Sequence, residues 1–214
     1  MSIKPIFWLS VDDSILDFVT INKPLIQISE KYPFFALCSG KYSPDIIKKF
    51  YHNATVIKSP NNRPIKGMIF YEHIKRKKHY NIIIRLCHDA LIMNTKKLFK
   101  RVDDGINAGY QVMGNIVTKK RKYDNKWVRG ACSAVTGKAA RAIKLRATDR
   151  MRSFDKCFGR AVVDAGIEFS SHPLFELGYE YTGEYPVWHP PQRITTEGKL
   201  LLFKQHLDKI EQCK

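Results

Sequence analysis

Apolar runs and helix-like segments alternate along the first 94 residues, and this alternation restricts the possible folds more than any other feature. Strand-like runs cover residues 5–11, 34–40, 55–58 and 81–94. Between them, Pro24 marks the first turn of one helix, Ser43 and Pro44 open a second, and a third covers residues 68–80. Strands that alternate with helices form mainly parallel sheets with helices packed on their faces. The sequence therefore predicts an α/β fold with a mixed, mainly parallel sheet in a single domain over residues 1–214.

The second half of the chain has a different pattern. It predicts a helix from residue 95 that ends at Gly105, strands over 110–117 and 126–135 around a polar hairpin, and helices over 136–154 and 154–166. An aromatic, proline-rich loop or edge strand follows at 171–192, and Thr195 or Thr196 opens a closing helix. Signatures of a serine triad, a P-loop, a zinc ribbon or a GxGxxG loop are absent.

The composition is typical of a basic protein whose cysteines are reduced. The formal net charge is +17, and 44% of the residues are hydrophobic, which is enough for a sizeable core. The five cysteines include no CxxC pair, and neither a signal peptide nor a membrane-length apolar run is present. We therefore expect a cytoplasmic location. The sequence does not predict an oligomeric state.

The fourth strand-like run is interrupted by Cys87, His88 and Asp89. A buried carboxylate without a partner costs several kcal/mol, so Asp89 must reach solvent or meet a cation. In parallel sheets the ligand crevice lies beyond the carboxyl ends of the strands. Five charged side chains should converge there: Asp12, Asp13, Arg63, Lys66 and Asp89. Alternatively, Asp89 is a local cap or pairs with Arg85.

Four short motifs resemble GT-A type glycosyltransferases. "LCHDALI" stands where that family has Asp-x-Asp, with Cys87 in place of the first Asp and Asp89 retained. "WVRGACSAVTGKAARAI" resembles the family's aromatic strand, small Gly-Ala turn and helix. "SFDKCFGRAVVDAGIEF" resembles its acidic helix start, with Asp155 at the carboxylate position and Ser153 and Phe154 replacing the acidic companion. "YPVWHPPQ" places His189 where many members have a metal-binding histidine.

The resemblance implies a metal-dependent transferase with a nucleotide-sugar donor, most simply a UDP-sugar. Residues 1–94 would form the nucleotide-sugar-binding half, 95–192 the acceptor half and 193–214 a C-terminal helix. Asp89 and His189 would bind Mn²⁺ or Mg²⁺, and Asp155 would be the base of an inverting reaction. The donor would contact Asp12, Asp13, Arg63, Lys66, His88, Gly130 and Ala131.

Each of these assignments has a structural alternative. Asp155 fits equally a helix N-terminus stabilised by the macrodipole, and His189 fits a loop histidine packed by Trp188 and Pro190. Arg63 and Lys66 also read as solvated charges, and Asp12 and Asp13 as a turn.

Positive charge is concentrated between Lys119 and Arg160, where fourteen Lys or Arg and three Asp give a net charge of +11. One stretch mixes cations with aromatic residues, a combination that binds phosphates and unpaired bases: Lys119, Lys120, Arg121, Lys122, Lys126, Trp127 and Arg129. We therefore hypothesise that DNA is a partner and that the acceptor is a hydroxymethylated pyrimidine, a DNA modification found among bacteriophages. The alternatives are a glycan or lipid-linked acceptor at a membrane surface, and a nucleic-acid-binding protein without catalysis.

Overall fold

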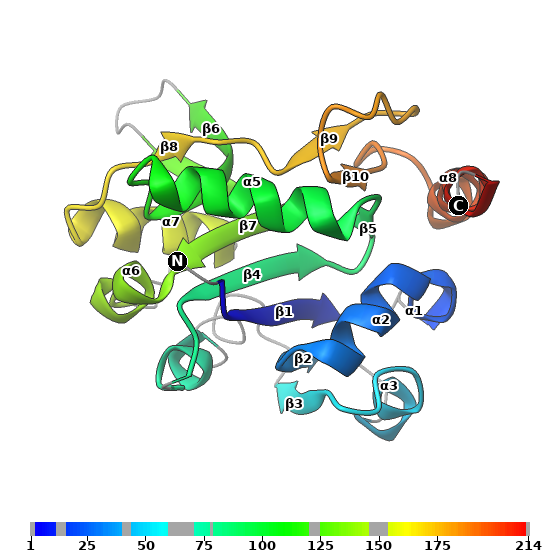
Figure 1. The fold of residues 1–214 in the computed structure, drawn as a ribbon, viewed down its shortest axis with the longest axis horizontal. Helices are drawn as coiled ribbons and strands as arrows, with labels where there is room; N and C mark the ends of the chain where they lie inside the picture. The colour runs from blue at the N-terminus through cyan, green and yellow to red at the C-terminus, as the bar shows by residue number, and fades with distance from the viewer. Residues whose placement is uncertain are drawn as a thin grey trace.

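A seven-stranded sheet forms the centre of the molecule (Figure 1). The computed structural model describes residues 3–11, 16–39, 44–59, 71–77, 79–119, 125–145 and 154–212. Across the sheet the strands are β3 (Thr55–Ser59), β2 (Phe34–Ser39), β1 (Pro5–Val11), β4 (Ile82–Cys87), β7 (Asn125–Thr136), β6 (Val112–Lys119) and β8 (Ser170–Ser171). The first four run parallel, and β7 is antiparallel to both β4 and β6. Strand β4 therefore joins the parallel half to the mixed half.

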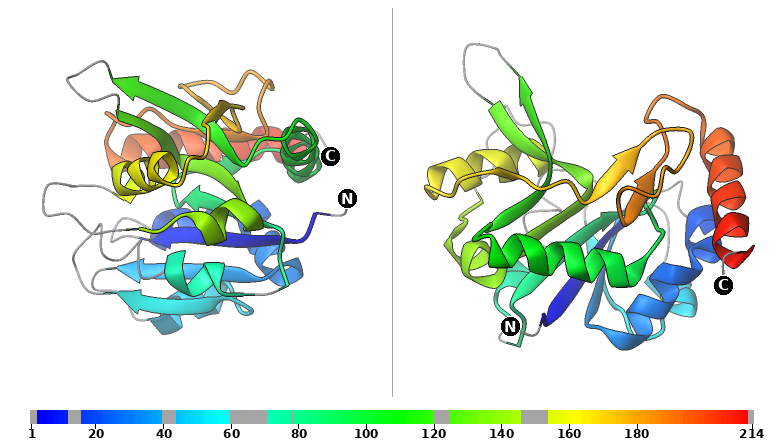
Figure 2. Two further views of the ribbon diagram at one scale, coloured as in Figure 1. Left: turned by 90° about the vertical axis from the view of Figure 1, so that its left-hand side faces the viewer. Right: turned by 45° about the horizontal axis from the view of Figure 1, so that its top comes forward.

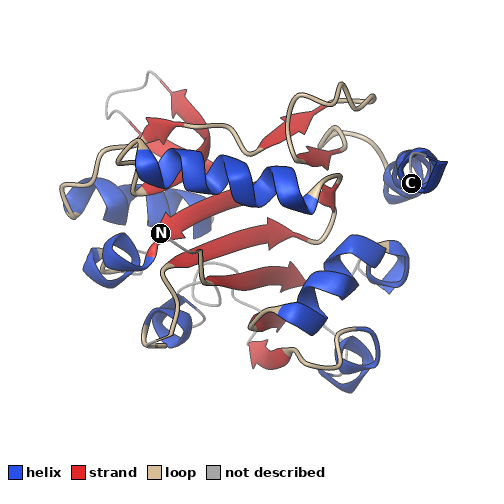
Figure 3. Cartoon of the chain, in the orientation of Figure 1, coloured by secondary structure: helices blue, strands red, loops and turns tan. Residues whose placement is uncertain are grey.

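Helices cover both faces of this sheet, as Figure 3 shows. On one face, α2 (Lys23–Lys31), α3 (Pro44–Phe50) and α5 (Thr95–Asn107) pack on Phe7, Leu9 and Ile84. On the other, α6 (Gly137–Ala142), α7 (Phe154–Asp164) and the helical residues 71–75 pack on Ile6, Trp8 and Ile83. Alternate residues of β1 and β4 thus pack into the cores on opposite faces of the sheet, as expected for a sheet buried on both sides.

A second, three-stranded sheet lies beyond the carboxyl end of β4. It consists of β5 (Leu91–Ile92), β10 (Val187–His189) and β9 (Phe175–Leu177), with β5 and β10 antiparallel. Trp188 and Leu91 pack there against Phe18 of α1 (Leu16–Ile21) and Phe203 of α8 (Thr196–Gln212). Figure 2 shows α8 beside α1, so the C-terminal helix rests against the first helix of the chain.

Several predicted elements are confirmed, among them a strand over residues 5–11, a helix that starts near Pro24 and a strand beginning at Phe34. The single strand over 81–94 is wrong. Strand β4 ends at Cys87, the Ala90 amide donates to the Cys87 carbonyl across a turn at 3.2 Å, and Leu91–Ile92 enters the second sheet.

Three predicted helix ends are also wrong. The helix predicted over residues 68–80 has its last helical residue at Lys75. Helix α5 continues past Gly105 to Asn107, because Gly105 provides the space in which Met113 packs rather than a stop signal. The helix after Thr136 ends at Ala142, where Ile143 turns extended and enters the core. The Ser43 cap, residues 68–70, the hairpin tip at 120–124 and residues 146–153 lie outside the described residues. None of the described helices is long and apolar enough to cross a bilayer.

Candidate functional site

Asp89 lies in the turn after β4 and is almost fully buried. Its Oδ1 is 3.0 Å from Nε2 of His189, and its Oδ2 accepts a hydrogen bond of 2.8 Å from Nζ of Lys199. The second sheet creates this contact, because β10 pairs with β5 immediately after Asp89 and carries His189 at its end. Lys199 comes from the first turn of α8. The two residues predicted to bind metal therefore meet, although their role as ligands remains a prediction.

The charges around Asp89 outweigh the cost of burying it. Burial by itself raises the pKa of the Asp89 carboxyl. The hydrogen bond and charge of His189, the charge of His88 and the hydrogen bond from Lys199 act in the opposite direction, and the net result is a lowered pKa. Asp89 is thus held as a carboxylate, the form that binds cations.

The hydrogen bonding of His189 fits a metal ligand. Its Nδ1 is 2.6 Å from the Pro190 carbonyl, which can only accept, so Nδ1 carries a proton. Nε2 then faces a carboxylate oxygen, and that arrangement requires either a second proton or a cation shared between the two atoms. Oxygen and nitrogen atoms that share a cation at bond lengths of about 2.1 Å lie about 3.0 to 3.4 Å apart, depending on the coordination geometry. A metal-binding histidine commonly donates its other N–H to a backbone carbonyl, as here.

Two further side chains of the same turn could contribute to a metal site. Cys87, His88 and Asp89 each present a ligand atom, and these three atoms all lie within 4.8 Å of one another. The His88 ring also packs edge-on against the Phe18 ring, with centroids 5.9 Å apart. The turn therefore offers sulfur, nitrogen and oxygen donors together.

Asp155 occupies a separate position on the face of the sheet. It lies in the first turn of α7 and forms an ion pair with Arg85 of β4. The Arg85 guanidinium packs against two aromatic rings, 5.1 Å from the Trp8 centroid and 4.7 Å from that of Phe154. The alternative in which Arg85 pairs with Asp89 is wrong, because Arg85 reaches Asp155 and Asp89 is paired with residues from the C-terminal segment.

Gly130 of β7 makes room for this ion pair. A Cβ atom at this position would lie 3.0 Å from both Nη2 of Arg85 and Oδ2 of Asp155. The neighbouring Ala131 side chain is buried in the core on the opposite face. Of the two small residues predicted to contact the donor, Gly130 alone lies against the Arg85–Asp155 pair.

The remaining predicted residues are placed only in part. Asp12, Asp13, Arg63, Lys66, Lys120, Arg121 and Lys122 lie outside the described residues. The backbone of Lys119 ends β6, and that of Lys126 lies in β7. Trp127 and Arg129 are half-buried in β7, and the Lys156 ammonium is 5.8 Å from the Trp127 ring centroid.

The sequence reasoning missed Lys199 and gave Arg85 the wrong partner. Lys199 had no signal, because a lysine in the first turn of a helix looks like an ordinary surface charge. Arg85 did carry a sequence signal, since a cation inside an apolar strand needs a buried partner. That partner is 70 residues away along the chain and could not be identified from sequence.

Comparison with known proteins identifies the fold. No protein-family model matches the chain, and no curated protein matches it in sequence. Among solved structures it is similar to the mannosyltransferase PcManGT from Pyrobaculum calidifontis in complex with GDP-Man and Mn²⁺, with a TM-score of 0.59 and 12% identity over 81% of this chain. The match spans 55% of the mannosyltransferase's own length.

Two further similar structures cover the whole fold. The galactosyltransferase LgtC, solved with donor and acceptor sugar analogues, gives a TM-score of 0.59 at 10% identity over 95% of both chains. The inositol-1-phosphate CTP transferase from T. maritima gives 0.58 at 11% identity, over 99% of this chain and 97% of that one. The chain therefore has a GT-A-like fold, and the predicted fold class is confirmed.

Proposed function

We propose that the protein is a metal-dependent glycosyltransferase that moves a sugar from a nucleotide-sugar donor to a hydroxyl acceptor. The observation that carries the proposal is the contact between Asp89 and His189 at the carboxyl end of β4. In an α/β sheet this edge is where ligands bind. The similarity to two glycosyltransferases supports the same assignment.

Oδ1 of Asp89 and Nε2 of His189 would hold the divalent cation, Mn²⁺ or Mg²⁺ by the resemblance. When bound, it would offset the negative charge of the diphosphate leaving group. Lys199 already neutralises the other oxygen of Asp89, so one carboxylate oxygen is left for the cation. Asp12, Asp13, Arg63, Lys66 and His88 remain the proposed donor contacts, and a UDP-sugar the proposed donor.

Asp155 is the proposed base. Its Oδ1 is fixed by Arg85, and its side chain is 28% exposed, so the carboxylate is oriented and still accessible. It would take the proton of the acceptor hydroxyl as the acceptor oxygen bonds to the anomeric carbon. The bond from that carbon to the phosphate oxygen breaks, the nucleoside diphosphate leaves, and the configuration at the sugar inverts.

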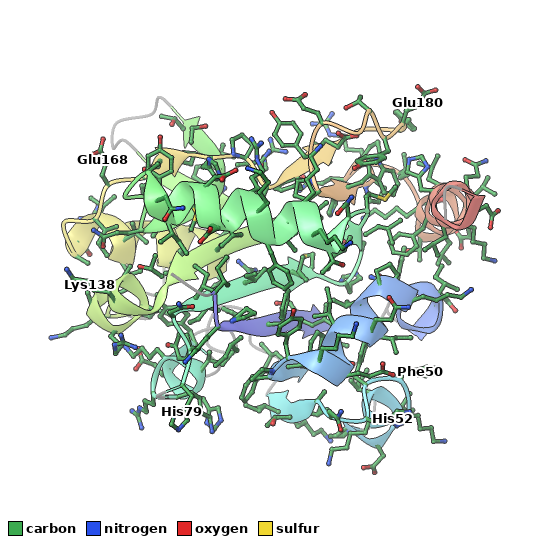
Figure 4. The ribbon with its side chains drawn as sticks, viewed as in Figure 1. Phe50, His52, His79, Lys138, Glu168 and Glu180 are labelled. Carbon is green, nitrogen blue, oxygen red and sulfur yellow. The ribbon has the colours of Figure 1, made fainter. Side chains whose placement is uncertain are left out.

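A hydroxymethylated pyrimidine in DNA is the acceptor that we favour. Strand β7 runs from the basic stretch through Trp127 and Arg129 to Gly130, which lies against Asp155. A polyanion bound along this strand would be led toward the proposed base. Lys138 of the same segment lies elsewhere, since Figure 4 shows it at the end of the molecule opposite α8. A glycan or lipid-linked acceptor and non-catalytic nucleic-acid binding are the alternatives.

Nucleotidyl transfer is a second candidate because a CTP transferase has a similar fold. Residues 12–21, which follow the first strand, contain no glycine. Glycines let backbone amides approach phosphate groups closely, and their absence here favours a donor held by side chains and a cation over a triphosphate cradled by backbone.

Release of nucleoside diphosphate from a panel of nucleotide sugars, with Mn²⁺, Mg²⁺, Zn²⁺ or Co²⁺, tests the proposal. The wild type should release one nucleoside diphosphate, Asp89→Asn should not, and the matched variant Asp104→Asn on the exposed face of α5 should behave as wild type. A second arm offers nucleoside triphosphates with sugar 1-phosphates. Pyrophosphate release there, with no turnover of nucleotide sugars, would reject glycosyl transfer.

The acceptor is tested by incubating the enzyme and its preferred donor with hydroxymethylated DNA, followed by digestion to nucleosides and mass analysis. A base that gains the mass of one sugar supports the DNA acceptor. Transfer to a glycan or lipid with no mass gain on any base would overturn it. Asp155→Asn should abolish transfer yet retain donor binding, and normal transfer by this variant would exclude Asp155 as the base.

A further inference from the structure

The turn that carries Asp89 is unusual in the chemistry of its donors. Two carboxylates separated by one residue, as in Asp-x-Asp, present only oxygen, and oxygen suits Mg²⁺ and Mn²⁺. Here the first position is Cys87, and His88 lies between the two. The turn itself presents one sulfur, one imidazole and one carboxylate, and His189 adds a second imidazole in contact with Asp89.

The backbone brings the three donors of the turn together. The hydrogen bond from the Ala90 amide to the Cys87 carbonyl closes a turn around His88 and Asp89. Sulfur and nitrogen ligands of a tetrahedral Zn²⁺ lie about 3.6 Å apart, given bonds of about 2.3 and 2.1 Å. All three donor atoms of the turn lie within 4.8 Å of one another, so each pair is at most about one ångström beyond this separation.

Among the residues that the structure describes, oxygen donors are scarce around Asp89. Lys199 holds Oδ2, so Asp89 contributes a single oxygen to any cation. The group of potential ligands found among the described residues contains no second carboxylate. Mg²⁺ is usually bound through one or two carboxylates, with waters and substrate phosphates completing the octahedron, and Asp89 offers it a single oxygen beside a sulfur and a nitrogen that it does not favour.

From these observations we infer that the Cys87–Asp89 turn, together with His189, binds a thiophilic divalent cation such as Zn²⁺ or Co²⁺ in preference to Mn²⁺ or Mg²⁺, with the Cys87 thiolate as a ligand. On binding, the Cys87 thiol releases its proton to solvent, and the thiolate and Asp89 together balance the charge of the cation. The inference rests on the proposed function for what the cation does, and on the turn alone for which cation is bound.

Titration of the metal-free full-length protein with Co²⁺, without any donor, tests the assignment directly. A thiolate ligand gives cobalt an intense near-ultraviolet charge-transfer absorption, and oxygen and nitrogen ligands do not. The wild type should develop this band at one equivalent, and Cys87→Ser should lack it. Cys157→Ala, which removes a thiol buried in α7, should retain it. Thermal unfolding curves of both variants establish that they are folded.

Competition against a chelating dye then measures selectivity. Cys87→Ser should weaken Zn²⁺ binding by about 100-fold, because removing a ligand should cost at least as much as removing a residue that hydrogen-bonds to a ligand. Cys87→Asp, which restores Asp-x-Asp, should bind Mn²⁺ more tightly than the wild type does. Equal Zn²⁺ affinity in wild type and Cys87→Ser, or the absence of the cobalt band in the wild type, would overturn the inference.

The two proposals fail in different ways. A cobalt band that depends on Cys87, with no turnover of any nucleotide sugar, would reject the transferase and leave the metal assignment standing. Turnover with Mn²⁺ that is unchanged in Cys87→Ser, together with no cobalt band, would reject the metal assignment and leave the transferase standing.

Discussion

The two carboxylates that depend on β4 lie in contrasting environments. Asp89, at the end of the strand, has an 8% exposed side chain and is held by two residues that follow it by 100 and 110 positions. Asp155 has a 28% exposed side chain and is held by Arg85 from within the strand. The first is closed in by a turn, a strand and a helix, and the second keeps one face open. Buried, fixed charge suits the retention of a cation, whereas an oriented and accessible carboxylate suits proton transfer.

The largest effect should come from Asp89→Asn. Removing this charge leaves the Lys199 ammonium without its buried counter-charge, and breaking a buried pair costs about 3–5 kcal/mol. Urea unfolding should show this loss, together with loss of the cobalt band. The control Asp104→Asn removes the partner of a pair that is more than half exposed and should change stability by less than about 0.5 kcal/mol. Equal stability of the two variants would mean that the Asp89 network is not a structural element.

The Asp89 contribution should also depend on pH. Its pKa is lowered from an ordinary value of 3.8, so the stability it confers is fully present above that value and is lost as the pH falls below it. The difference in unfolding free energy between wild type and Asp89→Asn should therefore shrink steadily below about pH 4. A difference that grows on acidification would contradict the assignment of Asp89 as ionised.

Arg85→Met should have the next largest effect, since it removes the partner of Asp155. The pair is less buried than the Asp89 network, and we expect a loss of about 2 kcal/mol, including the contact with the two aromatic rings. Turnover should fall because Asp155 loses the residue that orients it, while the cobalt spectrum should not change. A changed spectrum would show that the two carboxylates are coupled through β4.

Gly130→Ala should cost less, about 1 kcal/mol, because the new methyl group would meet the tips of two side chains that can shift. The expected signature is reduced turnover with unchanged metal binding, as for Arg85→Met. Unimpaired turnover would indicate that the position of Asp155 is not critical.

The smallest effect should come from Arg160→Ala, which removes an ion pair with Asp164 on α7. Both side chains are more than half exposed, so the change in stability should be within about 0.5 kcal/mol. Since α7 also carries Asp155, this variant separates effects of the helix from effects of the Arg85 pair. A large loss here would weaken any conclusion drawn from Arg85→Met.

Sequence predicted what depends on local patterning. An uninterrupted apolar run placed β1 correctly, and Pro24 placed the start of α2 to within a residue. The break after Cys87 was missed because Leu91 and Ile92 are as apolar as β4, and only their pairing with Val187 and Trp188 assigns them to another sheet. The same long-range pairing brings His189 to Asp89, a proximity that the sequence reached only through a family resemblance.

The second sheet determines at what stage of chain synthesis the proposed site is complete. The strands β1 to β4 can pair as the chain is made, since they are early in the sequence and adjacent in space. The side chains of His189 and Lys199 are added last, when about nine-tenths of the chain has been synthesised. A nascent chain can therefore hold a finished parallel sheet and still lack two of the side chains of the proposed cation site, which is completed only with the final strand and helix.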